Sequence, residues 1–163
     1  MKELFEVIHK GVNISIQDFG REQFRHLGIP VSGVMDRLAY QIGNLLIGNQ
    51  KNVASIEIAF GGTVLKALNH FEIVITGGNL VPTVNGEPGE MYKIIRLNKD
   101  DILAFRGAKN GIYTYLSVSG GINSQIHFDS QSTYHRAALG LNVSKGAIIY
   151  GVDEKEKLAR IGL

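Results

Sequence analysis

The sequence predicts a mainly β fold, a β-barrel that carries one main α-helix at about residues 37–47. Twenty glycines and only three prolines punctuate the chain, and glycine pairs separate several apolar runs, as expected for a chain that reverses direction often. The apolar runs follow one another too closely for parallel strands joined by crossover helices. Only one stretch shows the spacing of an amphipathic helix.

Short β-rich runs mark the expected strands. The first two lie at residues 4–8 and 12–16, and in the second run Val12, Ile14 and Ile16 alternate with polar residues, the period of a half-buried strand. Further strands are expected at residues 54–60, 63–68, 71–76, 91–97, 102–105, 112–118 and 147–150. Asn85–Gly86 predicts a tight two-residue turn, and residues 109–111 a second reversal.

The helix has its own start and stop signals. Asp36 is placed to cap the N-terminus, and Gly48–Asn49 can end the helix in a left-handed conformation. A helix packed on a mostly antiparallel barrel is the resulting architecture. The apolar residues at helical spacing are Leu38, Ile42, Leu45 and Leu46.

The composition indicates one soluble domain. The chain has 163 residues, and we assign residues 1–152 to this domain and residues 153–163 to a charged C-terminal tail. Seventeen Lys and Arg against 15 Asp and Glu argue against nucleic-acid binding, and no run approaches the length of a membrane span. The absence of cysteine excludes thiolate chemistry and disulfides. Without an apolar signal-like N-terminus, we expect a cytoplasmic protein.

Common catalytic motifs are missing. The sequence has no phosphate-binding P-loop, no dinucleotide-binding Gly-x-Gly-x-x-Gly and no Gly-x-Ser-x-Gly nucleophile elbow. Its five histidines lack the spacing of a helical metal site, so no metal site is expected.

A polar, glycine-rich block between the second strand and the helix is the main candidate site. Gln17 and Asp18 end an alternating strand, Arg21 is suited to bidentate binding of a carboxylate or phosphate, and Ser32 precedes the helix start, which favours anions. The structural alternative is that Asp18 pairs with Arg21 across a turn and Asp36 only caps the helix.

Two further polar features lie outside this block. Residues 130–136 carry hydroxyl groups and Arg136, which suit either a ligand site or an ordinary Ser- and Thr-rich loop. Glu57 interrupts an apolar run; facing the barrel interior it needs a partner, and facing solvent it has no special meaning.

Taken together, these blocks resemble the biotin-dependent carboxyltransferase-like family, also called the allophanate hydrolase subunit 2 family. That family includes the C-type subunit of the bacterial 5-oxoprolinase, the Kip antagonist protein and the carboxyltransferase part of urea carboxylase. The resemblance covers residues 12–150. The pieces that carry it are, in chain order, Ile16–Arg21, Gly28–Asp36, Asn44–Asn49, Glu57, Gly61–Gly62, Thr76–Gly77, Gly120–Ile122 and Ser132–Tyr134.

The resemblance implies a cyclophilin-like β-barrel and a component of an ATP-dependent 5-oxoprolinase that opens 5-oxoproline to glutamate. Members of the family carry a second barrel-like half, so we expect this chain to represent the N-terminal half, whether as a truncated gene, a split subunit or a fragment. Asp18, Arg21 and Asp36 are the predicted catalytic residues. The predicted substrate-binding residues are Gln17, Ser32, Glu57, Ser132, Thr133, Tyr134 and Arg136.

The implied cofactor is ATP, bound by this chain or by a partner subunit. The implied partners are a sister subunit, which is the B-type subunit of 5-oxoprolinase and belongs to the kinase-inhibitor family, and a further A-type subunit. Two alternatives stay open. One is a regulatory protein that antagonises a histidine-kinase inhibitor, and the other is a carboxyltransferase domain, for which biotin on a separate carrier would be required.

Overall fold

A computed structural model gives the fold and describes residues 1–27, 32–124, 126, 129–133, 140, 143–153 and 162. The strands are β1 (Lys2–Lys10), β2 (Asn13–Gln17), β3 (Ser55–Ala59), β4 (Thr63–Ala67), β5 (Phe71–Asn79), β6 (Pro82–Val84), β7 (Glu87–Pro88), β8 (Ile95–Leu97), β9 (Ile102–Phe105), β10 (Asn110–Val118), β11 (Ile122–Asn123) and β12 (Ile148–Gly151). The helices are the 3-10 helix η1 (Glu22–Leu27) and the α-helix α1 (Arg37–Leu46).

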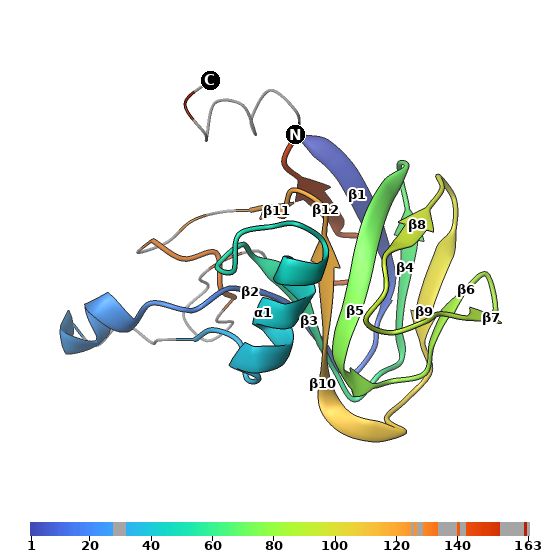
Figure 1. Ribbon diagram of the computed structural model, residues 1–163, viewed down its shortest axis with the longest axis horizontal. Coiled ribbons are helices and arrows are strands. Elements are labelled where there is room, and N and C mark those ends of the chain that lie inside the picture. The colour runs from blue at the N-terminus through green and yellow to red at the C-terminus, as the bar shows by residue number, and fades with distance from the viewer. Residues whose placement is uncertain are drawn as a thin grey trace.

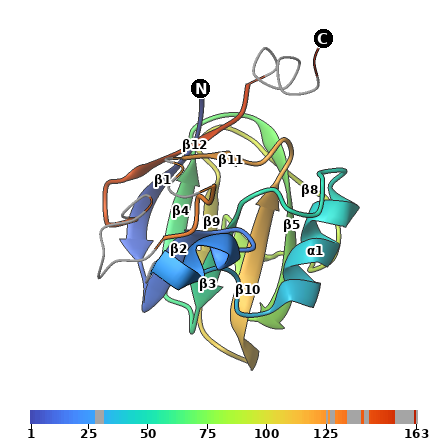
Figure 2. The ribbon, with the colours of Figure 1, turned by 90° about the vertical axis from the view of Figure 1, so that its left-hand side faces the viewer.

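The strands form two sheets, with orders β11-β12-β1-β4-β9-β6-β7 and β2-β3-β10-β5-β8. Every strand pairing in the described residues is antiparallel, as the short connections predicted. The sheets enclose a common core, and α1 lies outside it against the second sheet (Figures 1 and 2). The predicted mainly β fold with one main helix is therefore confirmed.

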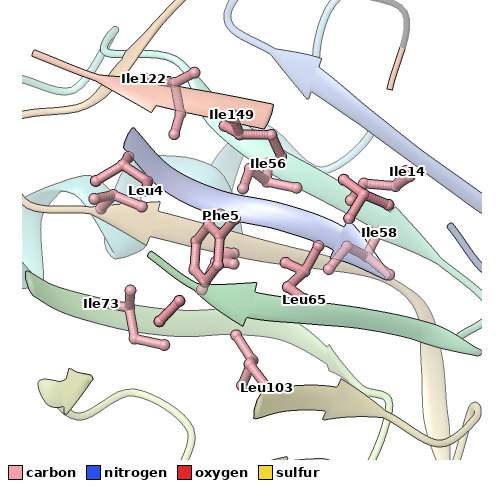
Figure 3. Packing of buried hydrophobic residues seen from close by; sticks show 14 of the residues in the cluster. Leu4, Phe5, Ile14, Ile56, Ile58, Leu65, Ile73, Leu103, Ile122 and Ile149 are labelled. Carbon is pink, nitrogen blue, oxygen red and sulfur yellow. The ribbon is translucent and has the colours of Figure 1, made fainter. Parts of the chain in front are cut away.

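The core lies between the two sheets, because alternate residues of each strand point toward the other sheet. Phe5 of β1 makes an edge-to-face contact with Phe71 of β5, with ring centroids 5.0 Å apart. Figure 3 shows isoleucine and leucine side chains from both sheets converging around Phe5. Burial of these side chains is the main stabilising contribution to the fold.

The Asn85–Gly86 turn and the signals at both ends of the helix act where they were expected, whereas the reversal predicted at residues 109–111 lies earlier, because β10 already begins at Asn110. Asn85 and Gly86 have φ values of 51° and 83° and join β6 to β7, and such values at both central residues match a tight hairpin turn. The carboxylate of Asp36 accepts a hydrogen bond from the backbone N–H of Ala39 at 3.1 Å and caps α1. Gly48, at φ 81°, follows the end of the helix, as predicted.

The helix packs through a different face from the apolar stripe that predicted it. Its buried residues are Ala39, Tyr40, Gly43 and Asn44. By contrast, Leu38 and Leu45 are 68% and 75% exposed. A Cβ at Gly43 would lie 2.5 Å from the Oγ of Ser117, so glycine permits the close approach of α1 to β10.

The remaining differences concern short elements. The strand predicted at 91–97 is confined to β8, because the chain turns through residues 91–93. Strands β6, β7 and β11 and the helix η1 were not predicted, and each of these strands is only two or three residues long. The predicted tail falls mostly outside the described residues. In the described part of the chain, no helix is long and apolar enough to span a membrane.

Candidate functional site

The five-stranded sheet has a buried polar face on the side opposite the core. In β2 and β3 the isoleucines point into the core, and the residues between them point to the other side. The register places Ser15 beside Glu57, and Glu57 beside Tyr115. This polar face comprises Ser15, Gln17, Ser55, Glu57, Thr76, Tyr115 and Ser117, all buried. Buried polar groups need hydrogen-bond partners, and the segments that cover the sheet supply many of them.

Asp18 anchors residues 130–132 to the end of β2. Its Oδ1 accepts hydrogen bonds from the hydroxyls of Ser130 at 2.6 Å and Ser132 at 2.8 Å, and from the backbone N–H of Gly20 at 2.9 Å. Its Oδ2 accepts one from the backbone N–H of Gln131 at 2.9 Å. The carboxylate thus joins two segments that lie far apart in the sequence.

Arg21 is held just beside this anchor. Its side chain is fully buried, and its guanidinium donates to the backbone carbonyls of Ser132 at 2.5 Å and Ser130 at 3.4 Å. Burial lowers the pKa of Arg21, and the negative charge of Asp18 opposes that shift. In this geometry both Arg21 and Asp18 fix the course of residues 130–132.

Gln17 and Ser32 connect the loop before the helix to the same segment. The Gln17 side chain donates to the hydroxyl of Ser15 at 3.0 Å and accepts from the backbone N–H of Gly33 at 3.0 Å. The Ser32 hydroxyl donates to the carbonyl of Thr133 at 2.7 Å. Ser32 has a φ of 53°, a conformation unusual for a residue other than glycine, so the loop is held under strain. Such strain concentrates at functional sites.

A second network centres on Glu57, which is only 5% exposed. Its Oε2 accepts hydrogen bonds from the Tyr115 hydroxyl at 2.7 Å and from the backbone N–H of Met35 at 2.9 Å. Burial raises the pKa of Glu57, and the two hydrogen bonds partly oppose that rise. Glu57 therefore faces neither the core nor solvent, the two alternatives that the sequence left open.

Tyr115 completes this network and was not identified from the sequence. Its hydroxyl donates to Glu57 and accepts from the backbone N–H of Asp36 at 2.8 Å. Burial, and then the charge of Glu57, raise the pKa of Tyr115, so the hydroxyl keeps its proton. The residue was missed because its place beside Glu57 depends on the β3–β10 register, and Tyr113 offers the same local signal two positions earlier.

The structure therefore brings most of the predicted site residues together. Gln17, Asp18, Arg21, Ser32, Ser132 and Thr133 form one connected hydrogen-bond network. Glu57 and Asp36 are joined through Tyr115 in a neighbouring network that holds the same loop. Tyr134 and Arg136 lie outside the described residues.

Among the predicted site residues that the structure describes, Ser32 and Asp36 are the best placed to contact a ligand. Ser32 is half-buried and Asp36 is exposed, whereas Asp18 and Arg21 are engaged by the surrounding chain. Beside them, the guanidinium of Arg37 lies over the Phe19 ring at 5.3 Å.

Two further observations concern cavities and metal ligands outside the predicted site residues. A cavity of about 600 Å³ lies at the start of β1 and β5, lined in part by Lys2, His70 and Arg96, and none of the predicted site residues lines it. Within the described ranges, no cluster of three or more acidic or histidine side chains is arranged to hold a metal ion.

Comparison with known proteins gives a consistent family. A family model described as the carboxyltransferase domain, subdomain A and B, matches residues 27–159. The chain is 34% identical over 137 residues to the C-type subunit of 5-oxoprolinase from Haemophilus influenzae, a match that covers 84% of this chain and 44% of that protein. It is also 34% identical over 139 residues to urea amidolyase of Lachancea kluyveri, covering 83% of this chain and 8% of that protein.

Solved structures show the same similarity. The urea amidolyase of Kluyveromyces lactis matches with a TM-score of 0.89 at 28% identity, over 96% of this chain and 10% of that one. The urea carboxylase of the same yeast matches with a TM-score of 0.86 at 28% identity, over 96% of this chain and 14% of that one. The chain thus spans less than half the length of each of these relatives.

Proposed function

Because this chain belongs to the family of carboxyltransferase domains, subdomains A and B, we propose that it is the C-type component of an ATP-dependent 5-oxoprolinase. The observation that carries the proposal is the 34% identity to the C-type subunit of 5-oxoprolinase from Haemophilus influenzae, which extends over 84% of this chain. The network that holds residues 32–36 supports the proposal, because it fixes a hydroxyl and a carboxylate beside the start of a helix.

The proposed reaction opens a five-membered cyclic amide. Resonance stabilises the amide, so water attacks its carbon slowly. Transfer of the γ-phosphoryl group of ATP to the amide oxygen makes that oxygen a leaving group. Water then adds to the carbon, the ring C–N bond breaks and the nitrogen takes up a proton, which leaves an acyl phosphate. A second water hydrolyses this acyl phosphate, so that the carboxylate forms and phosphate departs. The products are glutamate, ADP and phosphate, and ATP is bound by this chain or by a partner subunit.

The described residues divide into two proposed roles. Ser32 and Asp36 hydrogen-bond the substrate or its attacking water, since Ser32 is half-buried and Asp36 is exposed in the described part of the site. Asp18, Arg21, Gln17 and Glu57 act as positioning residues that hold the loop and residues 130–133. The proposed catalytic action of Asp18 and Arg21 is therefore indirect.

A second candidate function is a carboxyltransferase domain of a urea carboxylase. The 34% identity to urea amidolyase and the TM-score of 0.89 to the Kluyveromyces lactis enzyme favour it. Under this alternative, biotin on a separate carrier supplies an activated carboxyl group. The Ser32 hydroxyl and the Asp36 carboxylate fit the N–H and carbonyl groups of a urea-like molecule equally well.

The test is 5-oxoproline-dependent ATP hydrolysis by the purified A-type and B-type subunits from the same organism, with and without this chain. We expect turnover only when the chain is present, and a large loss with Asp36→Asn, which keeps the shape of the cap. Asp100→Asn, the same change at an exposed carboxylate between β8 and β9, serves as the control. Turnover that is unaffected by the chain would refute the proposal. Urea-dependent activity that avidin abolishes would instead establish the carboxyltransferase alternative.

A further inference from the structure

The register of the two sheets brings four connections to one end of the two-sheet core. They are the β1–β2 connection (11–12), the β3–β4 connection (60–62), the β5–β6 connection (80–81) and the β9–β10 connection (106–109). Asn13 lies opposite Ala59, and Asn110 lies opposite Asn79, so the ends and starts of these strands are neighbours. This end is at the bottom of Figure 1, where β5 and β10 meet. We call the four connections, with Lys10 and Ile112 beside them, the loop platform.

The loop platform is tied together through its backbone. Gly62 donates a hydrogen bond to the carbonyl of Phe105 at 2.7 Å, and Gly107 donates one to the carbonyl of Leu80 at 3.1 Å. Gly61 packs so closely on Gly107 that a Cβ at Gly61 would lie 2.7 Å from the Cα of Gly107. Because these backbone groups bond one another, side chains are what the platform presents to solvent. The surface is therefore preorganised for binding.

Two bulky residues of the platform adopt an unfavourable backbone conformation. Phe60 and Val81 have φ values of 65° and 55°, a region that aromatic and β-branched residues rarely occupy. The strained conformations of Phe60 and Val81 do not place their side chains in the core, because the Phe60 side chain is 49% exposed and Val81 is also exposed. Val12 and Ile112, at 64% and 45% exposure, add to this apolar surface. Phe60 lies next to Ile112, because the backbone N–H of Phe60 donates a hydrogen bond to the carbonyl of Ile112 at 3.1 Å.

The apolar surface is flanked by positive charge. Lys10, Arg106 and Lys109 are exposed and form no ion pair within the described part of the chain. The four connections contain no Asp or Glu. A hollow of about 670 Å³ adjoins the platform and is lined by His9, Lys10, Gly11, Gly62, Ser144 and Lys145. The loop platform thus combines exposed apolar side chains with cations that form no ion pair in the described part of the chain.

We propose that the loop platform docks a partner protein through a segment that carries an apolar anchor residue flanked by carboxylates. The anchor packs against Phe60 and Ile112, and the carboxylates face Lys10, Arg106 and Lys109. A second copy of this chain would bring like charges together at the same surface. The choice of partner, the sister B-type subunit, rests on the proposed function.

The experiment measures binding of the B-type subunit to the full chain by isothermal titration calorimetry at two salt concentrations. Phe60→Asp introduces a residue that tolerates positive φ, so it tests the surface without adding strain. We expect this change and the double change Arg106→Glu with Lys109→Glu each to raise the dissociation constant about tenfold or more. Leu45→Asp makes the same kind of change on exposed helix α1 and is expected to leave the affinity unchanged.

The outcomes separate this inference from the proposed function. Equal affinity of wild type and Phe60→Asp, or a loss confined to Leu45→Asp, would overturn the platform and leave the oxoprolinase proposal standing. Absence of binding by wild type would overturn the inference, and turnover in the reconstituted assay then decides the proposed function separately. Self-association or binding to a mixed-sequence DNA duplex that Phe60→Asp abolishes would assign the platform to another occupant and overturn it as stated.

Discussion

Replacing Tyr115 with phenylalanine removes one hydroxyl and with it two hydrogen bonds. The hydroxyl donates to Glu57 at 2.7 Å and accepts from the backbone N–H of Asp36 at 2.8 Å. A hydrogen bond to a charged group contributes about 1.5–3 kcal/mol and a neutral one about 0.5–1.5 kcal/mol. At neutral pH we therefore expect Tyr115→Phe to lower the free energy of unfolding by roughly 2–4 kcal/mol.

The effect should depend on pH in a definite direction. Burial raises the pKa of Glu57 above its ordinary value of 4.5, so the native state favours the protonated form. The stability that Glu57 contributes is then fully present below its ordinary pKa and is lost as the pH rises through its raised native value. Since the Tyr115 hydrogen bond lowers the pKa of Glu57, its removal raises that pKa further and enlarges the loss. At about pH 4 the effect should shrink toward that of neutral hydrogen bonds.

The assay is denaturant unfolding at about pH 4 and about pH 8, analysed by linear extrapolation. Tyr113→Phe is the matched control, because Tyr113 lies two residues away on the same strand and no hydrogen bond of its hydroxyl is found within the described residues. In a Glu57→Gln background, the pH dependence of Tyr115→Phe should disappear. An equal loss of stability at both pH values would refute the assigned role of the Glu57 charge.

Three further changes test other parts of the structure. Gly43→Ala should destabilise the protein by about 1–3 kcal/mol in chemical unfolding, although alanine favours helices, because its Cβ would meet the Ser117 hydroxyl at 2.5 Å; unchanged stability would show that α1 can shift away from β10. Phe60→Asn should leave the free energy of unfolding unchanged or raise it by up to about 1 kcal/mol, since asparagine tolerates positive φ; a clear loss would mean that Phe60 serves the fold. Asp18→Asn should lower the free energy of unfolding by about 1–3 kcal/mol, because the amide nitrogen would face the backbone N–H of Gln131, and a fully stable variant would contradict the anchor role.

Several features of the candidate site follow from local sequence alone. The alternation of Ile14 and Ile16 with Ser15 and Gln17 marks β2 and separates its core face from its polar face. The sequence marked residues 17–36 and 130–136 as two separate polar blocks, and only the family resemblance grouped them into one site. The structure shows that Asp18 and Ser32 contact residues 132–133. Whether these residues act on a substrate stays a prediction.

Local signals determined where α1 begins and ends and where one hairpin turns, because a cap or a turn depends on a few adjacent residues. Asp36 caps α1 by accepting a hydrogen bond from a residue three positions later, and Asn85–Gly86 closes a hairpin because both residues tolerate a positive φ. Only the tertiary structure decided which surfaces meet, since strand register and helix contacts join residues far apart in the chain. It buried Gly43 of the helix instead of Leu45, set Tyr115 beside Glu57, and gathered Phe60 and Lys109 at one end of the two sheets.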